Sequence, residues 1–205
     1  MFHNIVYPLL LFCWYSTGNY LYYNNNVRNF KLTKMHVSGI HALSVVISYL
    51  IGLPGNLLYY WSVTYYMMDT AYEFVELYNK TNLKLFNLGM MAHHFVTIGV
   101  MGYLEHHHGG KQLYYGFFLS ELSNLPMYVM YHLRAIKYNN WYVLKLIVVI
   151  EALAFIICRL ILGGILSFDL FVTSHVPAFV RFASFLILII SVIWTKKLVK
   201  QIYYT

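Results

Sequence analysis

Charged residues are scarce in this sequence of 205 residues, of which 10% are Asp, Glu, Lys or Arg and 60% are apolar. Soluble domains usually carry about a quarter charged residues and about half apolar ones. So few charges leave most of the apolar surface without a polar cover in water. The composition therefore argues against soluble, disordered, fibrous and disulfide-rich proteins, and it predicts a chain that lies mostly within a lipid bilayer.

Cysteine is also scarce, since Cys13 and Cys158 are the only two and both lie in apolar runs. A thiol in such a run usually behaves as a small apolar residue, so we expect neither a disulfide framework nor a cysteine metal site. The sequence contains no glycine-rich nucleotide loop. Its net charge of +7 does not indicate nucleic acid, because the basic residues fall in the gaps between apolar runs.

Seven segments are long and apolar enough for helices that cross a bilayer, each of which needs about 20 residues. The chain is therefore predicted to be an all-α, polytopic membrane protein. Turn or charge signals separate the segments, and Gly163, Gly164 and Asp169 are expected to close the sixth. The segments are 2–23, 35–53, 57–78, 85–104, 113–133, 142–165 and 171–194.

The basic residues between these segments indicate an orientation. With seven spans, eleven Lys and Arg flank one side of the membrane and Lys111 alone flanks the other. Cytosolic flanks carry such an excess, so the N-terminus is predicted to be lumenal and the C-terminus cytosolic, in the endoplasmic reticulum or a related internal membrane. The eleven are Arg28, Lys31, Lys34, Lys80, Lys84, Arg134, Lys137, Lys145, Lys196, Lys197 and Lys200.

Ionisable residues inside the spans are the most informative, because such a group at mid-bilayer costs a few kcal/mol. Asp69 lies about 18 Å along its predicted helix. His93, His94, Glu121 and Glu151 fall near the same depth. This convergence predicts that the helices surround a common polar cavity.

Helical spacing places polar residues on single faces of three spans. Such stripes suit a bundle around a polar cavity, although polar groups also hold membrane helices together. Arg159 and Arg181 are expected to pair with acids of the bundle. The stripes are Tyr65, Asp69, Glu73 and Glu76; Glu121, Asn124, Tyr128 and Tyr131; and His41, Ser44 and Ser48.

The adjacent pair His93 and His94 is the most chemical feature of the sequence. Neighbouring residues of a helix point about 100° apart, so one imidazole can face the cavity while a carboxylate holds the other. A neutral imidazole can serve as a general base or as a nucleophile in acyl transfer, and a nearby acid fixes its tautomer. A metal site with His and Glu ligands is the chemical alternative.

Residues 37–42, 66–69, 91–97 and 121–126 together resemble the TLC-domain family, which includes ceramide synthases, TRAM proteins and orphan members. The resemblance covers residues 35–200 and implies six helices in a barrel-like bundle around a central cavity. Residues 1–34 would be an extra N-terminal helix with a basic loop, and 201–205 a cytosolic tail. The sequence looks closer to the orphan members, because Asn124 stands where the synthases have a second acid.

The resemblance implies acyl transfer from acyl-CoA to a lipid amine or hydroxyl. His93 or His94 would accept the acyl chain or a proton, and Asp69 and Glu121 would orient the imidazoles. The residues expected to bind substrate are His41, Tyr65, Glu73, Glu76, Thr97, Asn124, Tyr128, Glu151, Arg159 and Arg181.

Membrane lipids and acyl-CoA are the expected partners, with the CoA drawn to the basic cytosolic rim. We expect no metal, resident cofactor or nucleic acid. The alternative function is a non-enzymatic protein that binds, senses or transports lipids and adjusts membrane composition. A channel ranks last, because its spans would be expected to break near mid-membrane.

Overall fold

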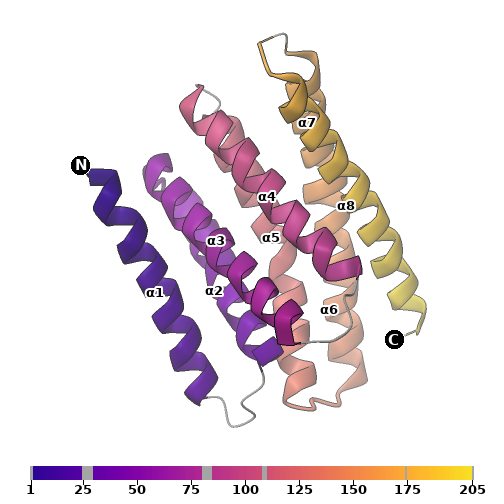
Figure 1. Cartoon of the computed structure of the whole chain (residues 1–205). Coiled ribbons are helices and arrows are strands. Elements are labelled where there is room, and N and C mark those ends of the chain that lie inside the picture. The colour runs from indigo at the N-terminus through magenta and orange to yellow at the C-terminus, as the bar shows by residue number, and fades with distance from the viewer. Residues whose placement is uncertain (1, 25–29, 80–84, 108–109, 174, 205) are drawn as a thin grey trace. The chain divides into compact units, whose positions relative to one another are not determined.

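The computed structural model describes residues 2–24, 30–79, 85–107, 110–173 and 175–204, and the elements it contains are all helical. The all-α prediction is confirmed. Because α6, η1 and α7 follow one another without a break, they form one rod, and the described residues make seven rods (Figure 1). The elements are α1 (Phe2–Asn24), α2 (Phe30–Leu50), α3 (Gly55–Asn79), α4 (Leu85–His106), α5 (Gly110–Ala135), α6 (Trp141–Ala154), η1 (Phe155–Leu162), α7 (Gly163–Val172) and α8 (Ala178–Tyr204).

The chain divides into two compact units, and each is described by itself. The first unit comprises Met1–Val37 and Leu53–Leu113, and the second comprises Ser38–Gly52 and Tyr114–Thr205. The first therefore holds α1, the start of α2, α3 and α4, and the second holds the rest of α2, most of α5, and α6 to α8. The domain boundary that the sequence placed at residue 34 stays a prediction.

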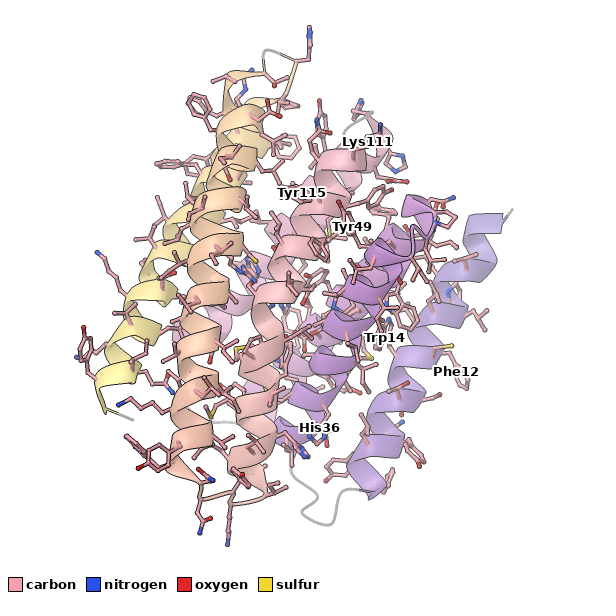
Figure 2. The ribbon with its side chains drawn as sticks, turned by 180° about the vertical axis from the view of Figure 1, so that it is seen from behind. Phe12, Trp14, His36, Tyr49, Lys111 and Tyr115 are labelled. Atoms are coloured by element: carbon pink, nitrogen blue, oxygen red, sulfur yellow. The ribbon has the colours of Figure 1, made fainter. Side chains whose placement is uncertain are left out.

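In the first unit, α3 packs against both α1 and α4. Trp14 of α1 is 1% exposed, whereas Phe12, two residues earlier, is 64% exposed. Figure 2 shows Trp14 directed among the helices and Phe12 directed away from them. The Trp14 indole packs on the Trp61 ring and donates a hydrogen bond of 3.3 Å to the Trp61 carbonyl. Gly18 of α1 leaves room for the Tyr72 side chain of α3, because an added Cβ would collide with the Tyr72 hydroxyl.

In the second unit, the α6–η1–α7 rod packs along α8 (Figure 1). Asn140 begins the rod as an N-cap, because its side chain accepts a hydrogen bond of 3.3 Å from the Val143 amide. The middle of the rod, η1, is π-helical over eight residues. π-Helical turns are rare and often mark functional positions.

In the same unit, Tyr49 of α2 and Tyr115 of α5 lie side by side with ring centroids 6.4 Å apart (Figure 2).

The predicted end of the sixth helix is wrong, and so is the start of the next one. The helix continues through Gly163 and Gly164 to Val172, and α8 begins at Ala178 instead of at residue 171. A glycine weakens a helix but does not stop it, whereas a proline disfavours helical geometry in the residue before it. Pro177 therefore sets the break, and the Thr173 hydroxyl closes the rod by donating to the Asp169 carbonyl at 2.7 Å.

Among the described helices, two rods have the length and apolar composition needed to cross a membrane, namely Trp141–Val172 and Ala178–Tyr203. Only 28% of the most apolar window of each is buried, so much of their apolar surface is not covered by the rest of the chain. A core helix of a soluble protein would be mostly buried instead. One outward stripe of the first rod is Ile150, Leu153, Ile157, Ile161, Ile165 and Phe168.

Candidate functional site

A buried polar cluster lies in the first unit where α2, α3 and α4 contribute side chains. Its buried members are at most 8% exposed, although most of them are ionisable. A sixth member, His93, is half-buried. We call this group the α3 cluster: Lys34, Asp69, Thr70, Glu73, His93 and His94.

Lys34 joins the two acids of the α3 cluster. Asp69 and Glu73 are four residues apart on α3, so they share one face of the helix. The Lys34 ammonium lies 3.5 Å from Asp69 Oδ1 and donates a hydrogen bond to Glu73 Oε1. A buried charge is tolerated when it has a partner, and here one ammonium serves two carboxylates.

His94 is held at both ring nitrogens. Its Nε2 lies 3.4 Å from Asp69 Oδ2, and its Nδ1 lies 3.3 Å from the Thr70 hydroxyl. In the tautomer that carries the proton on Nε2, His94 donates to Asp69, and its Nδ1 faces the Thr70 hydroxyl, whose single proton can go to Nδ1 or to the Tyr66 carbonyl 2.7 Å away. Tyr66 covers the ring at a centroid distance of 5.4 Å. Asp69 therefore uses one oxygen for Lys34 and the other for His94.

His93 lies beside this fixed imidazole. The two rings are 5.8 Å apart between centroids and inclined at 50°. His93 is half-buried, whereas His94 is 3% exposed. The pair is thus divided into an inner histidine with its nitrogens engaged and an outer histidine that a ligand can reach more easily.

Two residues of the first unit that were expected to bind substrate lie outside the α3 cluster. Thr97 follows His93 by one helical turn, and its Oγ1 is buried with no hydrogen-bond partner among the described residues. Tyr65 packs between Trp14 and Tyr66, at centroid distances of 5.4 and 5.2 Å, and so joins α1 to α3. The side chain of Glu76 lies outside the described part of the structure.

A second polar group occupies the second unit. His41 Nδ1 lies 3.6 Å from Glu121 Oε1, and the Asn124 amide donates to Glu121 Oε2 at 3.3 Å. His41 is fully buried, and Glu121 is nearly so. We call this group the α5 cluster: His41, Ser120, Glu121, Ser123, Asn124 and Arg159.

Arg159 completes the α5 cluster from the π-helical segment. Its Nε donates to Ser123 Oγ at 2.8 Å, and its Nη2 donates to Asn124 Oδ1 and to the Ser120 carbonyl, both at 3.0 Å. Its guanidinium also lies 4.9 Å from the Phe155 ring centre. Hydrogen bonds therefore connect Glu121 through Asn124 to Arg159.

The remaining predicted site residues lie elsewhere in the second unit. Tyr128 faces Gly39 of α2, where an added Cβ would be 3.4 Å from the Tyr128 Cβ. Glu151 is buried on α6. Arg181 Nε donates to the Val176 carbonyl at 2.7 Å, so this arginine fastens the turn before α8.

Sequence reasoning missed Lys34, which it counted among the solvent-facing basic residues of a cytosolic loop. The structure buries it on α2. A signal was present, because Lys34 precedes His41 by seven residues and so extends the polar stripe of His41, Ser44 and Ser48 by two turns. Without Lys34 the asymmetry of basic residues is still ten to one.

Neither a metal centre nor a known relative identifies the site. Throughout the described ranges, no three His, Cys, Asp or Glu side chains come together as a group that could hold a metal ion. No protein-family model, curated protein or solved structure matches the chain. The resemblance to the TLC-domain family therefore remains a hypothesis drawn from the sequence.

Proposed function

We propose that this chain is a multi-pass membrane protein of the TLC-domain type that transfers an acyl group from acyl-CoA to a lipid amine or hydroxyl. The observation that carries the proposal is the buried His94–Asp69 contact with His93 beside it. A fixed histidine–carboxylate pair next to a more accessible imidazole is suited to proton transfer in a site that excludes water.

Helix length supports seven membrane spans. The seven rods of the described residues run from 21 to 32 residues, and about 20 suffice to cross a bilayer. Apart from Arg159, which lies on the Trp141–Val172 rod, the members of the two polar clusters lie on the less apolar rods, and most of their ionisable groups are buried. Within this proposal the N-terminus is lumenal, the C-terminus is cytosolic, and the basic cytosolic flanks attract the phosphates of CoA.

His93 is the base in this proposal, and His94 is its support. Both nitrogens of His94 already face Asp69 and Thr70, whereas the ring of His93 is more exposed. Asp69 fixes the orientation of His94, and Lys34 in turn fixes Asp69. The acyl chain lies among the apolar side chains of the unit.

The reaction is a group transfer without redox change. The acceptor nitrogen or oxygen forms a bond to the thioester carbonyl carbon, and His93 takes the proton that the acceptor loses. The carbon–sulfur bond then breaks, and His93 returns the proton to the departing sulfur as CoA thiol is released. A general base of this kind contributes about 10²- to 10⁴-fold to a rate.

Purified protein in lipid nanodiscs, supplied with acyl-CoA and a panel of lipid amines and alcohols, tests the proposal. We expect an acylated lipid and free CoA by mass spectrometry, and a loss of about 10²- to 10⁴-fold in His93→Gln. His107→Gln is the matched control, because His107 is exposed and stacks on Tyr103. Failure to form product above a protein-free reaction with any acceptor would overturn the enzymatic proposal.

A second candidate is a lipid-binding protein without catalysis. The observation that favours it is the pairing inside the α3 cluster, where Lys34 contacts both carboxylates and holds α2 to α3. In this case a defined lipid would purify with the chain, and His93→Gln would retain it with no product formed by either protein.

A further inference from the structure

Threonine hydroxyls in the helices of this chain typically bond to their own helix. Thr17, Thr64 and Thr195 each donate to the carbonyl four residues earlier, at 2.8 Å in every case. This local bond satisfies the hydroxyl without help from another element. It is the expected state of a threonine in a helix with an apolar environment.

Thr97 departs from this pattern. It lies within α4, with the His93 carbonyl one turn before it, yet its buried Oγ1 has no hydrogen-bond partner in the part of the chain that the structure describes. Thr33 Oγ1 shares this property, but the residue four positions before Thr33 lies outside the described ranges. A buried hydroxyl without a partner is rare and calls for an explanation, and a ligand that supplies an oxygen is one.

The position of Thr97 indicates which ligand atom it meets. Thr97 follows His93 by four residues and His94 by three, and residues at these spacings are neighbours on one helical surface, with Cβ atoms about 5–6 Å apart. The Thr97 side chain is therefore a neighbour of His93, beside which the carbonyl carbon would be attacked.

We propose that Thr97 is a catalytic residue whose Oγ1–H donates a hydrogen bond to the carbonyl oxygen of the acyl-CoA thioester. This assignment rests on the proposed acyl transfer. As the acceptor bonds to the carbonyl carbon, the π electrons of the C=O bond move onto that oxygen, and the hydrogen bond becomes stronger. When the carbon–sulfur bond breaks, the C=O bond forms again and the sulfur leaves with the proton from His93.

Three variants separate the hydroxyl from the shape of the side chain. Thr97→Val keeps the shape and removes the donor, and Thr97→Ser keeps the donor. Loss of one oxyanion donor costs about 10²- to 10³-fold in kcat, so we expect that loss in Thr97→Val, with KM nearly unchanged, and less than about tenfold in Thr97→Ser. Thr64→Val is the control, because its hydroxyl bonds to the Tyr60 carbonyl away from the α3 cluster.

The melting temperature of Thr97→Val distinguishes the proposed role from a structural one, because loss of a structural hydroxyl would lower it. Thr97→Val replaces an unpartnered buried hydroxyl with a methyl group, so its melting temperature should equal or exceed that of the wild type. A less stable Thr97→Val that is as active as Thr97→Ser would overturn the assignment and leave the proposed function intact.

An unreactive ligand separates this assignment from the proposed function. In the probe, a CH₂ group stands between the sulfur and the carbonyl of a ¹³C-labelled acyl-CoA ketone, so no transfer occurs. We expect the infrared C=O stretch of the bound probe to lie lower in the wild type and in Thr64→Val than in Thr97→Val. Equal frequencies in all three proteins would overturn the Thr97 assignment alone. Absence of both probe binding and acyl transfer in the wild type would overturn the proposed function, and the Thr97 assignment with it.

Discussion

The α3 and α5 clusters are built around the same pair of groups, a buried histidine beside a carboxylate. His94 lies 3.4 Å from Asp69 in the first, and His41 lies 3.6 Å from Glu121 in the second. They differ in what surrounds the pair. The α5 cluster has one acid, which a hydrogen-bonded amide connects to one arginine, whereas the α3 cluster has two acids for one lysine.

In the proposed function, this difference separates a structural role from a chemical one. With both histidines neutral, the α5 cluster balances its charges and ties three helical segments together, as a polar network within a bundle does. The α3 cluster retains one carboxylate beyond its ammonium and includes the half-buried His93, and Thr97, whose buried Oγ1 has no hydrogen-bond partner among the described residues, follows His93 by one turn. In the proposed function, His93 and Thr97 are the groups that meet the ligand.

The largest effect on stability is expected from Lys34→Met. Removing the ammonium leaves Asp69 and Glu73 buried close together without their cation, and breaking a buried ion pair from one side costs about 3–5 kcal/mol. Equilibrium unfolding in mixed detergent micelles measures this loss. Lys111→Met, which removes an exposed lysine of the same unit, should change the unfolding free energy by less than about 0.5 kcal/mol.

A double variant sharpens the Lys34 result. Adding Glu73→Gln to Lys34→Met removes one of the two carboxylates left without the ammonium, so part of the lost stability should return. A double variant as unstable as the single one would show that Lys34 acts through packing of its alkyl chain and not through its charge.

A smaller effect is expected from Arg159→Met in the α5 cluster. Hydrogen bonds between membrane helices contribute only about 0.6 kcal/mol each on average, so three such bonds correspond to about 1–2 kcal/mol of unfolding free energy. Lys196→Met, which removes an exposed cation of α8, is the control. If Arg159→Met cost as much as Lys34→Met, the two clusters would not differ as described.

The sequence predicts the helices well, because apolar runs of membrane-spanning length admit few other structures. It also predicts that Asp69 and Glu73 share a face, since that follows from a spacing of four residues on one helix. It does not predict the π-helical segment, whose residues Phe155–Leu162 read as an ordinary apolar helix. Arg159 in this segment bonds to α5, and such a tertiary contact leaves no local signal.

The placement of Glu121 shows that the depth of a residue along its helix does not predict which side chains it contacts. The sequence places Glu121 near the depth of His93, His94 and Asp69, and the family resemblance implies that Glu121 orients the imidazoles. Within its own unit, Glu121 contacts His41 and Asn124. Depth alone does not say which face of a neighbouring helix a side chain meets, so the proposed link between Glu121 and the histidine pair stays a prediction.

The most direct test of the difference between the clusters compares acyl transfer by His93→Gln and His41→Gln in nanodiscs, with each rate divided by the amount of folded protein. If the α3 cluster carries the chemistry, kcat falls by about 10²- to 10⁴-fold in His93→Gln. In His41→Gln it falls by less than about tenfold, because the change there acts on bundle stability. Equal losses in the two variants, or a larger loss at His41, would contradict the account.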